Sequence, residues 1–192
     1  MKYYLDITLL PDTEISLGFL WQKVYQQIHI AFAENKIAEN QSAIAVSFPE
    51  YGNKQFPLGS KLRLLSQTQE QLQQLDIGKW LNRLTDYTHF KSIKEVPLTV
   101  NQFARFKRKQ FDTNAERLAR RRVLRKGESL EQALKHFGGF SDKETNLPFL
   151  NMKSLTNGDQ FKLFIERENF DKEEKGTFGC YGLSTGATVP WF

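Results

Sequence analysis

The chain has 192 residues, 40% of them hydrophobic, so it can bury a core as one domain or as two small packed domains. It has no run of about 18 apolar residues that could span a membrane and no hydrophobic start typical of a signal peptide, which predicts a cytoplasmic protein. Its single cysteine, Cys180, excludes an internal disulfide and a multi-cysteine zinc site, and the net charge of +5 favours an anionic partner.

The first half of the chain alternates between strand and helix patterns. Residues 3–10 alternate apolar and polar side chains and end at Pro11, whereas residues 16–35 repeat apolar side chains at helical spacing. We expect strands over 3–10, 42–48, 61–66 and 89–93, and helices over 16–35 and 68–84. The order strand, helix, strand, strand, helix, strand is that of a ferredoxin-like unit, which predicts the α+β class but no particular function.

The pattern breaks around Lys94 to Pro97. A basic segment follows, and then short strands rich in Phe, Gly and Ser. We therefore expect two domains, a ferredoxin-like domain over residues 1–96 and a C-terminal α/β domain over residues 97–192.

Positive charge is concentrated in residues 101–126. This segment holds ten lysines and arginines and two acidic residues, which gives 10 − 2 = +8, whereas the whole chain carries +5 and the remainder therefore 5 − 8 = −3. Such a concentration is expected where a polyanion docks on one face. A membrane surface is a weaker interpretation, because the segment lacks the aromatic and leucine-rich face of an interfacial helix.

A helix over about residues 114–126 is indicated at both ends. Thr113 and Glu116 have the spacing of a capping box, and Gly127 follows the last basic residue. Three arginines fall on one face of it and a fourth flanks that face, so like charges repel unless an anion compensates them. The basic residues of this helix expected to contact the polyanion are Arg117, Arg121, Arg122, Arg125 and Lys126.

Arginine holds phosphates with two parallel hydrogen bonds and can bind guanine edges. The arginines therefore favour a helix that binds nucleic acid over a helix that is only a solvated surface. Upstream, Arg105, Arg108 and Gln110 lie in an extended stretch where side chains could read base edges. A helix-turn-helix protein has a second helix packed before its recognition helix, whereas residues 97–111 read as extended. We therefore favour RNA over DNA.

Several motifs resemble the CRISPR RNA-processing endoribonucleases of type I-F systems, and they extend over the whole chain. They comprise Tyr4-Leu-Asp-Ile7, His29, Val46-Ser-Phe-Pro49, the arginine helix, Leu147-Pro-Phe149 with Ser154, Phe161-Lys-Leu-Phe-Ile165, Cys180-Tyr-Gly-Leu-Ser184 and Val189-Pro-Trp-Phe192. The terminal pattern is specific, whereas the arginine helix alone is not.

The resemblance implies an antiviral-defence endonuclease with a ferredoxin-like N-terminal domain and an arginine-rich helix inserted into the major groove of a repeat stem-loop. Such an enzyme cuts at the base of the stem, stays bound to its product and joins a crRNA-guided surveillance complex. It needs neither a metal nor a cofactor, because the 2′-hydroxyl beside the scissile phosphate is the nucleophile.

The resemblance also implies roles for individual residues. His29 matches the general base, Ser154 the serine that orients the 2′-hydroxyl, and Tyr181 an active-site tyrosine. Phe161 matches an aromatic residue that stacks on the last base pair of the stem, and the pair Arg108 and Gln110 matches residues that read bases low in the stem. Within the helix, the groove-reading positions fall on Arg121 and Arg125 or, with a shift of one residue, on Arg122, Arg125 and Lys126.

A histidine suits this task because its ordinary pKa of about 6.5 lies near working pH. His29 falls at the margin of the apolar stripe of its helix, so it can be anchored and still reach solvent. The alternatives are a non-catalytic module that binds structured RNA and a DNA-binding regulator. A metal-dependent nuclease is the least favoured, because no cluster of carboxylates or histidines has metal-site spacing.

Overall fold

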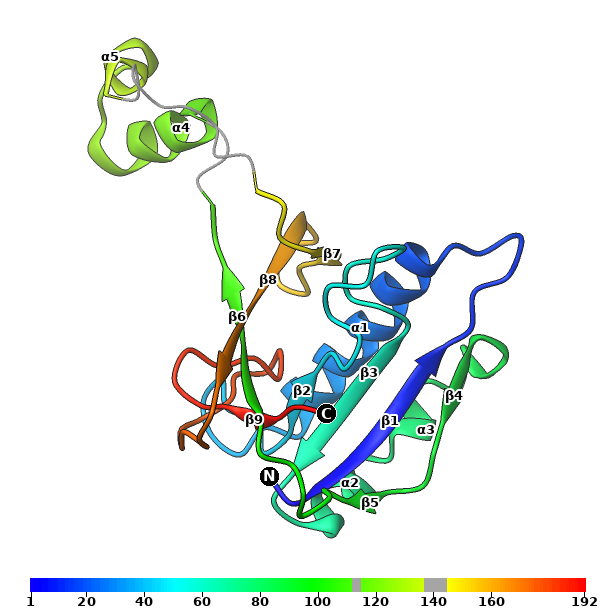
Figure 1. Cartoon of the computed structure of the whole chain (residues 1–192). Coiled ribbons are helices and arrows are strands. Elements are labelled where there is room, and N and C mark those ends of the chain that lie inside the picture. The colour runs from blue at the N-terminus through cyan, green and yellow to red at the C-terminus, as the bar shows by residue number, and fades with distance from the viewer. Residues whose placement is uncertain (112–114, 137–144) are drawn as a thin grey trace. The chain divides into compact units, whose positions relative to one another are not determined.

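The computed structural model of the chain describes residues 1–111, 115–136 and 145–192, and of residues 115–117 it describes the backbone alone. The chain divides into two compact units. The first comprises residues 1–108 and 148–192, and the second comprises residues 109–147. Each unit is described by itself below (Figure 1).

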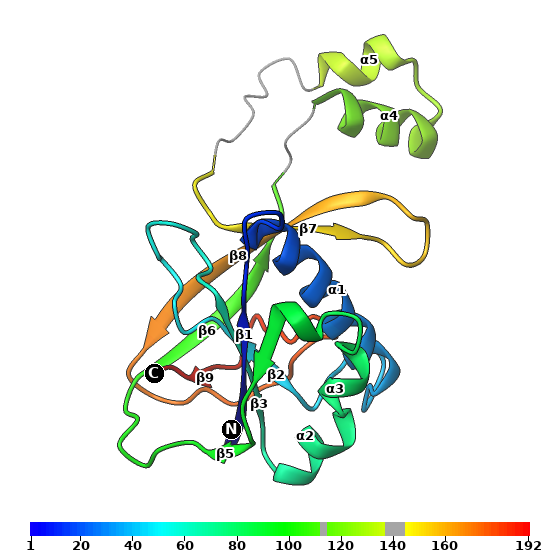
Figure 2. The same cartoon turned by 90° about the vertical axis from the view of Figure 1, so that its right-hand side faces the viewer.

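The first half of the chain builds one antiparallel sheet with helices. Its elements are β1 (Tyr3–Leu9), α1 (Leu17–Glu34), β2 (Ala45–Ser47), β3 (Lys61–Ser66), α2 (Gln69–Leu75), α3 (Ile77–Trp80), the 3-10 helix η1 (Thr85–Tyr87), β4 (Thr88–Phe90) and β5 (Lys94–Glu95). The sheet order is β2-β3-β1-β4, and β5 also pairs with β1. In Figure 2, α1, α2 and α3 lie together on one side of β1 and β3.

These elements confirm most of the expected ones. α1 begins after Ser16, whose side chain accepts a hydrogen bond from the Phe19 amide, and the apolar stripe of α1 is buried. The helix expected over residues 68–84 is instead interrupted at Asp76, which adopts a left-handed conformation with φ +46° and so separates α2 from α3. The strand expected at residues 89–93 is replaced by two short strands, β4 and β5.

The second sheet uses residues that follow the expected boundary at residue 96. Its strands are β6 (Phe103–Lys109), β7 (Phe149–Lys153), β8 (Gln160–Phe170) and β9 (Val189–Pro190), in the order β7-β8-β6-β9. The fold is therefore of the α+β class with two sheets. Both sheets contribute to the same compact unit, and the division into domains at residues 96 and 97 stays a prediction.

Aromatic side chains join the two sheets through a common core. The ring of Phe48 contacts Trp21 and Tyr25 of α1, and its centroid lies 5.2 Å from that of Phe106 on β6. The hydroxyl of Tyr51 donates a hydrogen bond to the carbonyl of Ile165 on β8. The core of the first sheet thus continues into the second, which fixes β6 and β8 relative to α1.

A buried ion pair ties the last residue to the first sheet. Arg63 on β3 donates two hydrogen bonds to the carboxylate of Asp6 on β1, at 2.6 and 3.0 Å, and a third to the carbonyl of Phe192. Its guanidinium also packs against the rings of Tyr4 and Phe192. Each charge is thereby paired and hydrogen-bonded, as a buried charge requires.

The second unit contains α4 (Ala115–Lys126) and α5 (Leu130–Lys135). Ala119 of α4 and Ala133 of α5 are buried. α4 ends at Lys126, and Gly127 follows with a φ of +67° and an amide that donates to the Val123 carbonyl, which confirms the predicted end of the arginine helix. The capping box predicted at Thr113 lies outside the described residues.

Within the described part of the chain, no helix combines the length and apolarity needed to cross a membrane.

Candidate active site

The candidate site begins with His29 on α1, next to the buried Ile28. His29 is half-buried, and its Nδ1 lies 2.9 Å from the carbonyl oxygen of Cys180. A carbonyl oxygen only accepts hydrogen bonds, so Nδ1 carries the hydrogen of this bond. In the neutral ring, Nε2 is then the nitrogen that can accept a proton.

Tyr181 covers one face of the His29 ring. The two rings are stacked, with centroids 4.0 Å apart and planes within 3° of parallel. The backbone of Tyr181 is fixed in turn, because the hydroxyl of the buried Tyr25 on α1 donates to its carbonyl at 2.8 Å. Two successive carbonyls, of Cys180 and Tyr181, are therefore bound by side chains of one helix, and this pairing determines how the imidazole is directed.

Gly182 lets the segment after Tyr181 pack closely on the first sheet. Its φ is +69°, and a Cβ at this position would come within 2.6 Å of the Val46 side chain and 2.8 Å of Phe32. The Gly182 carbonyl also accepts a hydrogen bond from the Val46 amide at 3.0 Å. Only glycine fits both the backbone angle and the space.

Arg108 supplies positive charge at the site. Its guanidinium carbon lies 5.7 Å from the ring centroid of Tyr181 and 5.2 Å from that of Phe161. Arg108 is exposed although it follows buried positions of β6, so its charge reaches the surface beside the stacked pair.

The surroundings change the acidity of both stacked rings. Burial lowers the pKa of His29, the hydrogen bond to the Cys180 carbonyl opposes this, and the charge of Arg108 lowers the pKa further. The pKa of Tyr181 is raised, chiefly by burial, with Arg108 acting in the opposite direction. At neutral pH the pair is a neutral imidazole, able to accept a proton, and a neutral phenol, able to donate a hydrogen bond.

Ser154 and Phe161 belong to the β7–β8 hairpin. Phe161 on β8 pairs with Met152 on β7, and Ser154 begins the turn, where its amide donates to the Asp159 carbonyl at 2.8 Å. The hairpin is attached to α1, because the Lys153 amide donates to the Gln26 side chain at 3.0 Å. Gln26 lies three residues before His29, so the Ser154 turn is tethered to the helix that carries the candidate base.

A pocket adjoins Tyr181 of the stacked pair. An open pocket of about 390 Å³ is lined by Arg108 and Tyr181 together with Glu39, Asn40 and Gln41. Both charged and amide side chains therefore face this space.

Basic side chains of the second unit have different environments. Arg121, Arg125 and Lys126 are exposed. Arg122 is instead paired with Glu128, and its Nη2 lies 2.9 Å from Nε2 of His136. Gln110, also in this unit, is exposed, whereas the side chain of Arg117 lies outside the described residues.

The sequence predicts that Arg105 contacts RNA. In the structure, however, its charge is already paired within the protein. It forms ion pairs with Glu168 and Glu174, and it donates a hydrogen bond to the Gly186 carbonyl at 2.9 Å. Its role as an RNA contact stays a prediction.

Sequence reasoning missed the groups that position the candidate base. The carbonyl of Cys180 and the hydroxyl of Tyr25 lie far from their partners along the chain, and a backbone carbonyl leaves no residue-type signal. The acidic partners of Arg105 and Lys107 on β8 had a visible signal, since Glu166 and Glu168 alternate along that strand, but sequence does not show which strand faces them. Within the described part of the chain, no group of three or more His, Cys, Asp or Glu side chains is placed to hold a metal ion.

The fold and this site define a class: a basic α+β protein with an oriented, half-buried histidine in one unit and an arginine-bearing helix in the other. Comparison with known proteins gives the family. Residues 4–192 match the family described as CRISPR-associated protein (Cas_Csy4), and the chain belongs to this Cas6/Csy4 family of CRISPR-associated endonucleases.

Two curated relatives match over their entire length. Both are named CRISPR-associated endonuclease Cas6/Csy4, one from Escherichia coli (strain UTI89 / UPEC) and one from Pseudomonas aeruginosa (strain UCBPP-PA14). The chain is 38% identical to the first and 34% identical to the second over 193 residues, with 100% of each chain covered.

Proposed function

We propose that this protein is a metal-independent endoribonuclease that binds the stem-loop of CRISPR repeat RNA and cuts it at the base of the stem. The observation that carries the proposal is the orientation of His29. Its Nδ1 is held by the Cys180 carbonyl and its face is covered by Tyr181, so Nε2 is directed as a proton acceptor.

The proposed reaction needs only a base, an aligned ribose and charge stabilisation. Nε2 of His29 takes the proton of the 2′-hydroxyl, and the 2′ oxygen attacks the adjacent phosphorus. The bond from phosphorus to the 5′ oxygen breaks, which leaves a 2′,3′-cyclic phosphate and, after protonation of the leaving oxygen, a 5′-hydroxyl. Ser154 orients the 2′-hydroxyl, and the neutral phenol of Tyr181 donates a hydrogen bond to the phosphate as its charge builds.

The lowered pKa of His29 supports this role. A general base acts in its deprotonated form, and burial together with Arg108 keeps the ring neutral at pH values where an exposed imidazole is partly protonated. The same Arg108 brings positive charge to the place where the phosphate would lie.

RNA binding is assigned to both units. Arg108 and Gln110 read bases low in the stem, and Phe161 offers its ring to the last base pair. In α4, the pairing of Arg122 with Glu128 favours the register in which Arg121 and Arg125 read the groove. Arg117 and Lys126 are proposed to contact phosphates.

The domain roles follow from the family. We assign residues 1–96 to a ferredoxin-like domain, supported by the sheet order β2-β3-β1-β4, and residues 97–192 to RNA recognition. After cleavage the protein stays bound to the mature crRNA and, in the cytoplasm, joins a type I-F crRNA-guided surveillance complex. The names of the relatives, as CRISPR-associated endonucleases, support a role in antiviral defence.

The test is incubation of the purified protein with the repeat hairpin of its own locus in excess EDTA, with and without a 2′-deoxy substitution at the cleavage site. Cleavage of the unmodified RNA alone is expected. Tight binding with no cleavage of either RNA would contradict the proposal and favour the alternative function, a non-catalytic module that binds structured RNA.

A further inference from the structure

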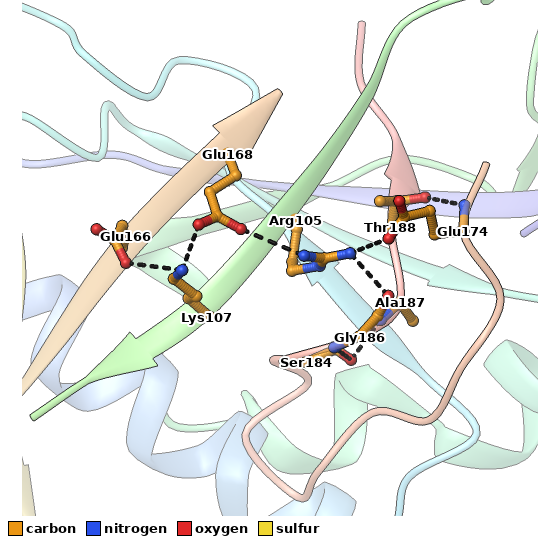
Figure 3. Close-up of polar contacts among 9 residues, drawn as sticks. All are labelled: Arg105, Lys107, Glu166, Glu168, Glu174, Ser184, Gly186, Ala187 and Thr188. Carbon is orange, nitrogen blue, oxygen red and sulfur yellow. Dashed lines mark hydrogen bonds and ion pairs between the residues drawn. The ribbon is translucent and has the colours of Figure 1, made fainter. Parts of the chain in front are cut away.

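Strand β6 presents its basic residues on two different faces. Arg108 follows Ala104 and Phe106 on the face that continues into the core and the candidate site, whereas Arg105 and Lys107 alternate with them onto the opposite face. On that opposite face they meet the carboxylates of the neighbouring β8. Figure 3 shows the two cations between Glu166, Glu168 and Glu174.

The guanidinium of Arg105 is held from several directions. Nη1 lies 3.3 Å from Glu168, and Nη2 pairs with Glu174 and donates to the carbonyl of Gly186 at 2.9 Å. The same group packs over the ring of Phe170, 4.4 Å from its centroid. The side chain is 13% exposed. Binding a phosphate would require Arg105 to leave two carboxylates and a carbonyl.

Charge makes that exchange unfavourable. Arg105 pairs with two carboxylates, those of Glu168 and Glu174, and Glu168 is shared with Lys107. Both carboxylates repel a phosphate that approaches Arg105. The positive surface offered by β6 therefore begins at Arg108.

The Gly186 carbonyl belongs to the loop of residues 177–187, which carries Cys180 and Tyr181. Ser184 organises this loop: its amide donates to the Phe106 carbonyl on β6, and its hydroxyl donates to the Thr177 carbonyl. The amides of Gly186 and Ala187 donate back to that hydroxyl at 3.1 and 2.8 Å. Arg105 and Ser184 thus fasten the loop to neighbouring positions of one strand, and Figure 3 shows the contact of Arg105 with Gly186.

We infer that Arg105 is a positioning residue that fastens the loop of Cys180 and Tyr181 to strands β6 and β8, and does not itself contact RNA. The inference rests on the proposed function, since the loop holds His29 as the base. A loosened loop lets the imidazole turn, and a misplacement of about 1 Å can reduce a rate by about 100-fold.

The test uses Arg105→Gln, with Lys107→Gln as a matched control. Both substitutions remove one positive charge from the same face of β6 and one partner of Glu168, but Arg105 alone also reaches Gly186. Arg108→Gln serves as the comparison for a loss of RNA contact.

For Arg105→Gln we expect the single-turnover cleavage rate at saturating protein to fall by about 10-fold to 100-fold. The hairpin Kd and its salt dependence should stay within about twofold of the wild type, because no phosphate contact is lost. Amide hydrogen exchange of residues 177–187 in the free protein should quicken. Lys107→Gln should change none of these quantities, whereas Arg108→Gln should weaken binding.

A weakened Kd with a shallower salt dependence for Arg105→Gln would overturn the inference and make Arg105 an RNA contact. Unchanged cleavage and exchange would overturn it as well. Should Arg105→Gln fail to fold, Glu174→Gln removes the more exposed partner of the same guanidinium and should give a smaller change in the same direction.

The exchange measurement requires no RNA, so it separates this inference from the proposed function. A wild-type protein that does not cut the hairpin would contradict the proposed function, and exchange would still decide whether Arg105 holds the loop.

Discussion

The chain holds its candidate base and the arginines proposed to read the RNA groove in opposite ways. His29 lies on an 18-residue helix with a large buried face, and its ring is fixed by a carbonyl on one edge and by Tyr181 on one face. Arg121 and Arg125 lie on a 12-residue helix of the small second unit, where their side chains are exposed.

The difference follows from what each group does. Proton transfer depends on direction and distances of a few ångströms, so the base needs a rigid environment. Attraction between arginine and phosphate acts over about 10 Å at moderate salt and tolerates many side-chain geometries. Fixed geometry in the first unit and exposed charge in the second are therefore the expected arrangement for an enzyme that binds a polyanion and cuts it at one bond.

The largest effect should come from removing the candidate base, His29. We expect His29→Ala to lower the single-turnover cleavage rate by about 100-fold to 10,000-fold, the usual contribution of general acid–base catalysis, while the hairpin Kd stays unchanged. His89→Ala is the matched control, because this histidine is exposed on β4. Cleavage by His29→Ala at the wild-type rate would show that the oriented imidazole is not the base.

Two glycines with the same left-handed backbone conformation test how closely the two regions are packed. Gly182→Ala should lower the free energy of unfolding by roughly 2–5 kcal/mol, because the new methyl adds overpacking against Val46 to the backbone penalty. Gly127→Ala at the end of α4 should cost about 1–2 kcal/mol, since its φ is +67° but a Cβ there meets nothing within 4 Å. Urea denaturation followed by circular dichroism measures both, and equal losses would argue against a specially close-packed loop at the site.

Removing exposed positive charge should weaken hairpin binding and leave the cleavage rate unchanged. We expect the double variant Arg121→Ala, Arg125→Ala to weaken hairpin binding roughly tenfold at physiological salt and to reduce the slope of log K against log salt by about two. The cleavage rate at saturating protein should stay near the wild-type value. Filter binding across a salt series measures the slope.

Arg122→Ala decides between the two helix registers. Its guanidinium is already paired with Glu128, so this variant should weaken hairpin binding less than the double variant does. A loss as large as that of the double variant would favour the register of Arg122, Arg125 and Lys126.

The smallest effect should be a shift in pH dependence. Cleavage should rise with pH as His29 loses its proton, and the midpoint should lie below the pKa of an exposed imidazole, because burial and Arg108 lower the pKa of His29. Arg108→Gln removes the smaller of these two effects, so the acid limb of the pH profile should move to higher pH.

The control is Lys23→Gln, which removes a positive charge from the exposed face of α1 and should leave the pH profile unchanged. Rates are measured at saturating protein, and an acid limb that stays in place in Arg108→Gln would show that the charge of Arg108 does not lower this pKa.

Sequence predicted the elements whose signals are local. The polar and apolar alternation of β1, the Ser16 cap and apolar stripe of α1, and Gly127 at the end of α4 are each written in neighbouring residues, and the structure confirms them. The break at Asp76 was missed, because the helical spacing of apolar residues continues through it. The family motifs named His29, Tyr181, Arg108 and Phe161, and the structure brings these four side chains together.

Sequence by itself therefore determined the α+β class, the location of positive charge, and the residue types available for chemistry. Tertiary structure decided which nitrogen of His29 is held, because the Cys180 carbonyl that binds it comes from 151 residues away. It also decided that Arg105 meets carboxylates while Arg108, three residues later, faces the site. The reason is that composition fixes how much charge a segment carries, whereas the pairing of strands fixes what each charge faces.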